Sequence, residues 1–132
     1  MGLYKIIKGF DEKALYAIAK TTDNKQLKDD VKYMRLPVHN GQRVYCERID
    51  KIAFFCGYCD RDHFRISGIG VNKDFQGKGF GSFMYMRCIQ YAKSKGVKKL
   101  KTRTLSGVDF YLRKVWKITG MKNNDFMTER DI

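Results

Sequence analysis

The stretch from Ile66 to Gly81 reads ISGIGVNKDFQGKGFG and sets the plan of the whole chain. With the three residues before it, the first part of this stretch predicts a strand over His63 to Val71. A turn and a glycine cluster at Gln76 to Gly81 follow this strand. Apolar residues then recur at intervals of three and four, which predicts an amphipathic helix that ends at Gly96. The recurring residues are Phe80, Phe83, Met84, Cys88, Tyr91 and Ala92.

A strand, a glycine turn and a helix in this order are typical of a phosphate site. Glycines allow tight backbone geometry, and the first N–H groups and positive dipole end of the helix point into the same space. The spacing Gln76-x-x-Gly79-x-Gly81 is not a P-loop, because no Gly-Lys-Ser/Thr follows. It is not a dinucleotide fingerprint either, because Met84 stands where a third glycine is needed.

Upstream, Leu3 to Phe10 predicts an opening strand. Asp11 is expected to cap a helix through Ala19, and a second helix is expected over Asn24 to Leu36, before Pro37. A loop from Val38 to Gln42 then leads into an antiparallel meander of three strands. We expect these strands at Arg43 to Ile49, Ile52 to Cys59 and His63 to Val71.

Downstream, a strand is expected at Lys98 to Leu105, a helix at Val108 to Thr119, and a last strand at Met121 to Thr128 that is broken by Asn123-Asn124. This order predicts an α+β fold with a mixed, mostly antiparallel central sheet flanked by helices. A chain of 132 residues is expected to form a single domain over residues 1–132.

The composition excludes several protein classes. Hydrophobic residues make up 43% of the chain, and a single proline is present, so a disordered or proline-rich linker does not fit. No apolar run approaches the roughly 20 residues that span a bilayer. The N-terminus lacks a secretory stretch, so we expect a soluble cytoplasmic protein without membrane partners, whose four cysteines are reduced thiols. We expect no metal ion. A zinc site usually takes four ligands from two Cys-x-x-Cys pairs, and here Cys56 and Cys59 form a single pair, with Cys46 and His63 as the remaining ligand candidates.

The positive charge is concentrated in one quarter of the chain. The net charge is +13, and residues 73–103 contain nine basic residues against one acid, Asp74. Such an excess indicates an anionic partner, which is a phosphorylated cofactor, an acidic substrate or nucleic acid. Lysines beyond Lys93 also complement the C-terminal dipole of the preceding helix, so simple surface solvation stays open.

The motif and its surroundings resemble the GCN5-related N-acetyltransferase (GNAT) superfamily. Members have Arg or Gln, two residues, Gly, one residue, then Gly or Ala between their fourth strand and third helix, as Gln76, Gly79 and Gly81 are arranged here. The run from Val71 to Gln76 and the Tyr91-Ala92 pair before Gly96 also agree. The resemblance is specific over about residues 63–105 and rests on element order elsewhere.

The resemblance implies that acetyl-CoA is the cosubstrate and acyl donor. In the family, the pyrophosphate lies on the N–H groups of the glycine turn, and pantetheine pairs like an extra strand with the strand before it. Carried over to this chain, the implied acetyl-CoA contacts are Ile69, Gly70, Val71, Gln76, Gly77, Lys78, Gly79, Phe80, Gly81 and Ser82.

The catalytic residues of the family are not all matched. Arg65 stands where some members have a glutamate base, and Trp116 stands where many have a tyrosine acid. Tyr111 is the nearest phenol on the expected last helix, so it is our candidate acid. His63, next to Asp60 and Asp62, is a further candidate for a base acting through water.

The function that these observations favour is acetyl transfer from acetyl-CoA to a primary amine by direct attack. The amine acceptor is not specified by any segment. Two alternatives stay open. One is a catalytically silent protein of this fold that binds nucleic acid through its basic residues, and the other is an acetyltransferase whose acceptor lies on tRNA or DNA.

Overall fold

The computed structural model describes residues 4–32, 38–39, 42–104, 117–122 and 125–132. Within these residues, seven strands form one mixed sheet in the order β1-β4-β5-β6-β7-β9-β8, and β2 and β3 form a separate two-stranded ribbon. The β6–β7 pair is parallel, and the other pairs are antiparallel. The predicted α+β class with a mixed, mostly antiparallel sheet is therefore confirmed.

The element bounds follow the predictions closely between residues 43 and 104. The strands are β1 (Ile7–Lys8), β2 (Val38–His39), β3 (Gln42–Arg43), β4 (Tyr45–Ile49), β5 (Ala53–Asp60), β6 (His63–Val71), β7 (Lys99–Thr104), β8 (Lys117–Lys122) and β9 (Asp125–Asp131). The helices are α1 (Glu12–Ala19), α2 (Lys25–Lys32), the short 3-10 helix η1 (Lys73–Phe75) and α3 (Phe80–Ser94).

Two predictions near the N-terminus need correction. The opening strand is limited to Ile7–Lys8, and the predicted loop at 38–42 contains β2 and the start of β3. The expected cap is confirmed, because the Asp11 carboxylate accepts a hydrogen bond from Ala14 N–H at 3.2 Å. The α2 helix is described to Lys32, and residues 33–37 lie outside the described residues.

The predicted helix over Val108 to Thr119 is wrong in its last part. Residues 117–119 belong to β8, which pairs antiparallel with β9 from Lys117↔Glu129 to Lys122↔Asp125. The predicted last strand is two antiparallel strands, β8 and β9, which end and begin on either side of the break expected at Asn123-Asn124. Residues 105–116 lie outside the described residues.

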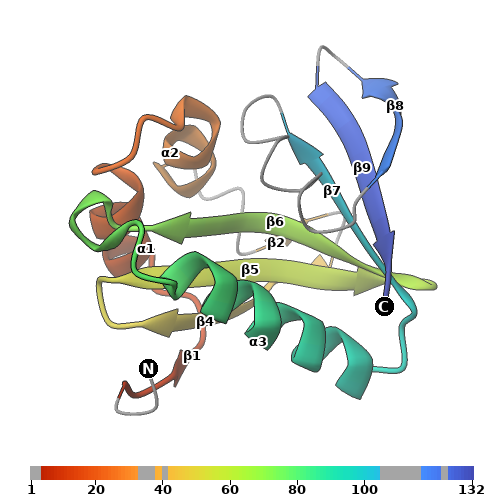
Figure 1. The fold of residues 1–132 in the computed structure, drawn as a ribbon, viewed down its shortest axis with the longest axis horizontal. Coiled ribbons are helices and arrows are strands. Elements are labelled where there is room, and N and C mark those ends of the chain that lie inside the picture. The colour runs from red at the N-terminus through yellow and green to blue at the C-terminus, as the bar shows by residue number, and fades with distance from the viewer. Residues whose placement is uncertain (1–3, 33–37, 40–41, 105–116, 123–124) are drawn as a thin grey trace.

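Helices cover both faces of the sheet (Figure 1). On one face, α3 packs on the β5–β6–β7 region through Met84, Cys88 and Ala92, which are fully buried with Phe64 and Leu100. On the other face, α1 and α2 bury a smaller apolar group that includes Leu15, Ile18, Leu27, Val31 and Phe54. The helices α1 and α2 therefore cover only part of the second face, and β6 and β7 are less buried on that side than on the side of α3.

A buried ion pair fixes α3 to the sheet. The Arg87 guanidinium donates to the Glu47 carboxylate at 2.8 Å, and Glu47 is 2% exposed. Tyr45 donates its hydroxyl to the same carboxylate and stacks on Tyr91, with ring centroids 3.6 Å apart. Burial, and secondly the bond to Glu47, raises the pKa of Tyr45, which therefore stays a hydrogen-bond donor. These contacts set the position of α3 relative to β4.

Strands β6 and β7 separate along their length. They pair only from His63↔Lys99 to Arg65↔Lys101, and Figure 1 shows them diverging beyond that point. The Thr102 hydroxyl donates to Ile66 O at 3.1 Å just past the last pair. The separation leaves the end of β6 from Ile69 to Val71 without a strand on its β7 side, among the described strands.

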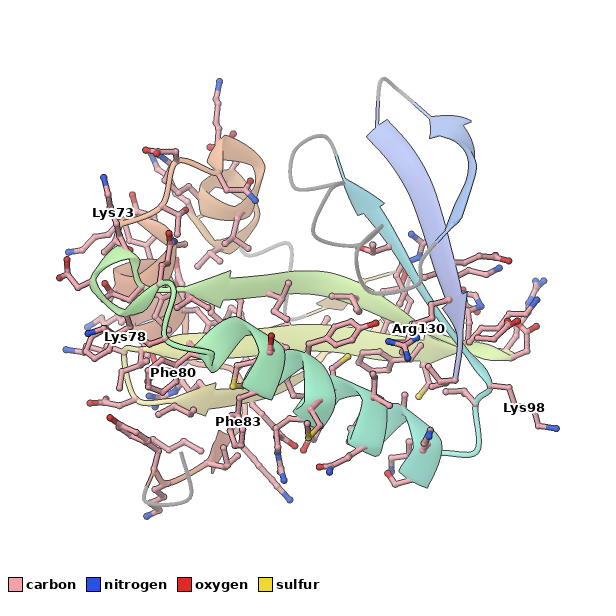
Figure 2. The ribbon with its side chains drawn as sticks, viewed as in Figure 1. Lys73, Lys78, Phe80, Phe83, Lys98 and Arg130 are labelled. Atoms are coloured by element: carbon pink, nitrogen blue, oxygen red, sulfur yellow. A yellow bond between two sulfur atoms is a disulfide. The ribbon has the colours of Figure 1, made fainter. Side chains whose placement is uncertain are left out.

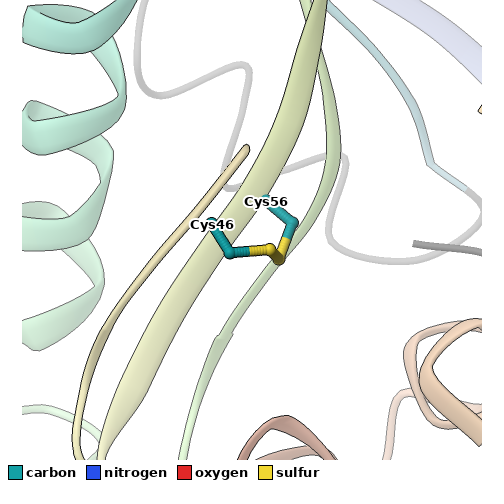
Figure 3. The surroundings of a disulfide bond; sticks show 2 residues. All are labelled: Cys46 and Cys56. Atoms are coloured by element: carbon teal, nitrogen blue, oxygen red, sulfur yellow. A yellow bond between two sulfur atoms is a disulfide. The ribbon is translucent and has the colours of Figure 1, made fainter. Parts of the chain in front are cut away.

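The expectation of four reduced thiols is wrong for two of them. Cys46 and Cys56 are directly opposite in the β4–β5 register and form a disulfide (Figure 3). Directly opposed strand residues bring their Cβ atoms close, which the sequence alone does not reveal before the register is known. Cys59 and Cys88 are free.

We expect two of the four cysteines to react with iodoacetamide when the protein is denatured without reductant, and all four after reduction. In the native protein, Cys59 should react before Cys88, because Cys88 is fully buried and burial raises the pKa of its thiol. Mass spectrometry of the alkylated protein measures both outcomes. Four alkylated cysteines without reductant would contradict the disulfide.

The described residues contain no helix that is long and apolar enough to span a membrane. They also contain no group of three or more His, Cys, Asp or Glu residues arranged to hold a metal ion.

Candidate functional site

The turn between β6 and α3 is held by side chains within it. Asn72 accepts from Asp74 N–H at 3.0 Å and so caps η1, while its amide donates to Lys51 O. The Gln76 amide donates to Val71 O at 3.2 Å, which ties the glycine cluster back to the end of β6. The turn is therefore ordered by polar contacts before any ligand is considered.

Positive backbone angles explain two of the glycines. Gly77 has φ +76° and Gly79 has φ +90°, a region that residues with a Cβ rarely adopt. The first intrahelical bond of α3 runs from Phe83 N–H to Gly79 O at 3.0 Å. The N–H groups of Phe80 and Gly81 therefore precede the helical ladder, at the positive end of a 15-residue helix. This geometry suits an anion.

The open edge of β6 presents backbone groups to the same region. Asn72 N–H donates to Ile52 O at 2.7 Å, on the β5 side. The N–H and C=O groups of an antiparallel strand alternate in direction, so Gly70 also faces β5. Ile69 and Val71 consequently direct their backbone groups away from β5. The Val71 carbonyl already accepts from Gln76, so an extended ligand lying along this edge can pair with the Val71 N–H and with the backbone groups of Ile69 as a strand does.

A cavity of about 340 Å³ lies beside this edge. Four residues implied by the resemblance line it, namely Ile69, Gly70, Val71 and Gln76. The other implied residues, Gly77 to Ser82, follow directly in the turn and first turn of α3. Figure 2 shows Lys73, Lys78 and Phe80 at this same end of the molecule. The structure thus brings the edge, the turn and the helix N-terminus together.

The remaining lining comes from the connection between α1 and α2, which sequence reasoning missed. Thr21, Thr22, Asp23 and Asn24 line the cavity with Leu27 and Lys73. The Thr21 hydroxyl accepts from Lys73 N–H at 2.9 Å, so the connection is anchored to the glycine turn. The four consecutive polar residues between two helices were the available signal for a connecting turn. The residue that this turn contacts, Lys73, is 52 residues from Thr21 in the sequence.

Gly70, next to Ile69, is required by close packing. A Cβ on Gly70 would lie 2.9 Å from the Phe54 ring and 3.0 Å from Leu27, so α2 approaches the strand closely there. The register between β5 and β6 shifts after Cys56, where Cys56 faces Gly68 and Gly57 faces Ile66. Ser67 is the extra residue of this bulge. Bulges reorient a strand locally, and this one lies where β6 parts from β7.

We expect Ser67→Ala to raise the free energy of unfolding by about 1 kcal/mol, because the buried Ser67 hydroxyl has no hydrogen-bond partner among the described residues. Thr102→Val is the contrasting variant, since its buried hydroxyl donates to Ile66 O, and we expect it to lower stability by about 1 kcal/mol. Urea unfolding of both variants measures the difference. A destabilised Ser67→Ala would show that the hydroxyl has a structural partner.

Of the candidate catalytic residues, the two that the structure describes, His63 and Arg65, do not line the cavity. Tyr111, our candidate acid, and Trp116 lie outside the described residues. His63 begins β6, at the end away from the glycine turn, and its ring contacts the Asp62 carboxylate at 3.2 Å. This contact is the main cause that lowers the pKa of Asp62. Arg65 lies two residues after His63 on β6 and is the last β6 residue paired with β7.

The described basic residues of 73–103 extend from one end of α3 to the other. Lys73 and Lys78 lie at the glycine turn, whereas Lys98 lies at the opposite end of α3 (Figure 2). The helix between them spans about 22 Å. The backbone N–H of Lys98 donates to the backbone carbonyl of Asp62, which places one acidic residue next to that end. Nucleic-acid binding stays a prediction.

Comparison with known proteins gives a consistent picture. The model of the "Acetyltransferase (GNAT) family" matches residues 12–121. No curated protein sequence matches the chain. The PaiA N-acetyltransferase of Thermoplasma acidophilum, solved with coenzyme A, is similar with a TM-score of 0.70 at 13% identity, over 97% of this chain and 99% of that one.

Two further solved structures have similar folds. The ribosomal-protein-S18-alanine N-acetyltransferase of Escherichia coli has a TM-score of 0.76 at 14% identity, over 98% of this chain and 94% of that one. A GNAT family acetyltransferase from Elizabethkingia anophelis with acetyl-CoA bound has a TM-score of 0.63 at 19% identity, with 97% of each chain covered.

Proposed function

This chain belongs to the acetyltransferase (GNAT) family, and from that premise we propose that it transfers the acetyl group of acetyl-CoA to a primary amine by direct attack. Two of the similar structures hold coenzyme A or acetyl-CoA, which supports the same cosubstrate here.

The observation that carries the proposal is the continuity of three features. The open edge at Ile69 and Val71, the cavity beside it and the N-terminus of α3 follow one another without interruption. Pantetheine, which is extended and contains amides, matches a strand edge, and a diphosphate matches N–H groups at a helix N-terminus. We assign pantetheine to the Ile69–Val71 edge and the diphosphate to the turn from Gln76 to Ser82.

The chemistry requires few side chains. The amine nitrogen attacks the thioester carbon, the C–S bond breaks, the amine loses a proton and the coenzyme A thiolate gains one. Backbone N–H groups on the open edge of β6 are suitable donors to the carbonyl oxygen as it becomes negative. Alignment of the amine and thioester contributes the rest of the acceleration. Tyr111 stays our candidate acid for the thiolate.

Isothermal titration calorimetry with acetyl-CoA and with coenzyme A tests the binding step directly. We expect 1:1 binding of both. An amine screen with thiol release as the readout then tests transfer. Absence of measurable acetyl-CoA binding by the folded protein would overturn the proposal.

A further inference from the structure

Two basic residues lie where β6 and β7 stop pairing. Beyond this point the two strands separate and leave an opening between them. Arg65 and Lys101 form the last pair of the β6–β7 ladder before the strands separate. Both side chains are half-buried rather than extended into solvent. Two cations therefore lie side by side where the sheet begins to open.

Both residues project from the face opposite α3. Their neighbours Phe64 and Leu100 are fully buried in the group that packs against α3. Side chains alternate between the two faces of a strand, so Arg65 and Lys101 belong to the other face. Because α3 covers its own face, an acceptor reaches the β6 edge from the side that these cations occupy.

The two cations are neutralised unequally. Lys101 Nζ lies 4.0 Å from the Glu129 carboxylate on β9. No carboxylate of the described residues lies within ion-pair distance of the Arg65 guanidinium. A guanidinium has a planar fork of donors that matches a carboxylate or a phosphate, and the described carboxylates leave this fork available to a ligand.

The position of Arg65 suits an acceptor site. Arg65 precedes Ile69 by four residues, which is about 13 Å of extended strand. With the diphosphate at the glycine turn and pantetheine along Val71 and Ile69, the thioester points toward Arg65. The acyl carbon then falls between Ile69 and Arg65, within the opening.

We propose that the acceptor is a primary amine with an anionic group, a carboxylate or a phosphate, close to its nitrogen, and that Arg65 binds this group with Lys101 beside it. This inference rests on the proposed function. The cation also favours the neutral form of a nearby amine, because a positive charge disfavours protonation of its neighbour. Arg65 thus contributes both to the selection of the acceptor and to the population of its nucleophilic form.

Two matched pairs of amines test the inference, namely β-alanine against its amide and O-phosphoethanolamine against ethanolamine. We expect kcat/KM to be at least tenfold higher for the anionic member of one pair, and the preferred pair distinguishes carboxylate from phosphate. Arg65→Gln should reduce this ratio to within about twofold, while Arg65→Lys keeps part of it. Calorimetric affinity for coenzyme A should stay unchanged in both variants.

Arg61→Gln is the matched control, because Arg61 lies in the exposed β5–β6 turn with φ +57°, away from the opening. It should keep the full preference. The inference is overturned if acetyl-CoA binds and neither anionic amine reacts faster than its neutral counterpart, or if Arg65→Gln keeps the preference. Failure of wild-type protein to bind acetyl-CoA would instead overturn the proposed function.

Discussion

Replacing Gly79 with valine is expected to weaken acetyl-CoA binding by more than a hundredfold while the protein stays folded. Gly79 is the N-cap of α3 with φ +90° and ψ 1°, and a β-branched residue is strongly disfavoured there. To relieve this strain, the turn must rotate the peptide groups that precede α3. The N–H groups of Phe80 and Gly81 then no longer converge on one point. Calorimetry with coenzyme A measures the loss, and far-UV circular dichroism checks the fold.

Gly96→Val provides the matched control for this prediction. Gly96 has φ +77° and open space around its Cα, so valine meets the same backbone strain. It follows α3 at the end opposite the glycine turn, and we expect coenzyme A affinity within about twofold of wild type. Normal binding by Gly79→Val would show that the diphosphate lies elsewhere. Equal loss in both variants would show that strain at either end of α3, rather than the turn itself, weakens binding.

The glycine turn could be predicted because its signals are local. The strand over His63–Val71 is confirmed with both bounds, and α3 begins at Phe80 as expected. Period-two alternation, positive-φ glycines and period-three-and-four apolar residues each act within a few positions of one another. The acetyl-CoA contacts in this stretch were implied by the resemblance to the GNAT superfamily, and they stay a prediction.

Features that depend on distant partners could not be predicted in the same way. Residues 117–119 form a strand because β9 supplies a ladder for them, which overrides their helical pattern. The Cys46–Cys56 disulfide needs the β4–β5 register, and the pairing of Arg65 with Lys101 needs the order of strands in the sheet. The lining from the α1–α2 connection depends on a hydrogen bond between Thr21 and Lys73.

Gly57→Ala is expected to lower the free energy of unfolding by about 3 kcal/mol, the largest stability effect of the changes considered. A Cβ at this position would overlap Arg65 O and the edge of the Phe64 ring, closer than real Cβ contacts occur. The carbonyl belongs to the backbone of β6, so relief requires movement of the strand next to the bulge. Urea unfolding monitored by fluorescence measures the change.

Gly81→Ala is the control for this change, because its new Cβ would meet Val71 Cγ2 at an ordinary 3.6 Å. Alanine in the first turn of α3 should raise stability by up to about 1 kcal/mol, since glycine is the poorer helix former. A loss of stability in Gly57→Ala together with a gain in Gly81→Ala would show that the strand needs glycine for space and that the helix does not. Wild-type stability in Gly57→Ala would mean that β5 and β6 yield at the bulge, and Arg65 would then not be held at a fixed position beside the opening.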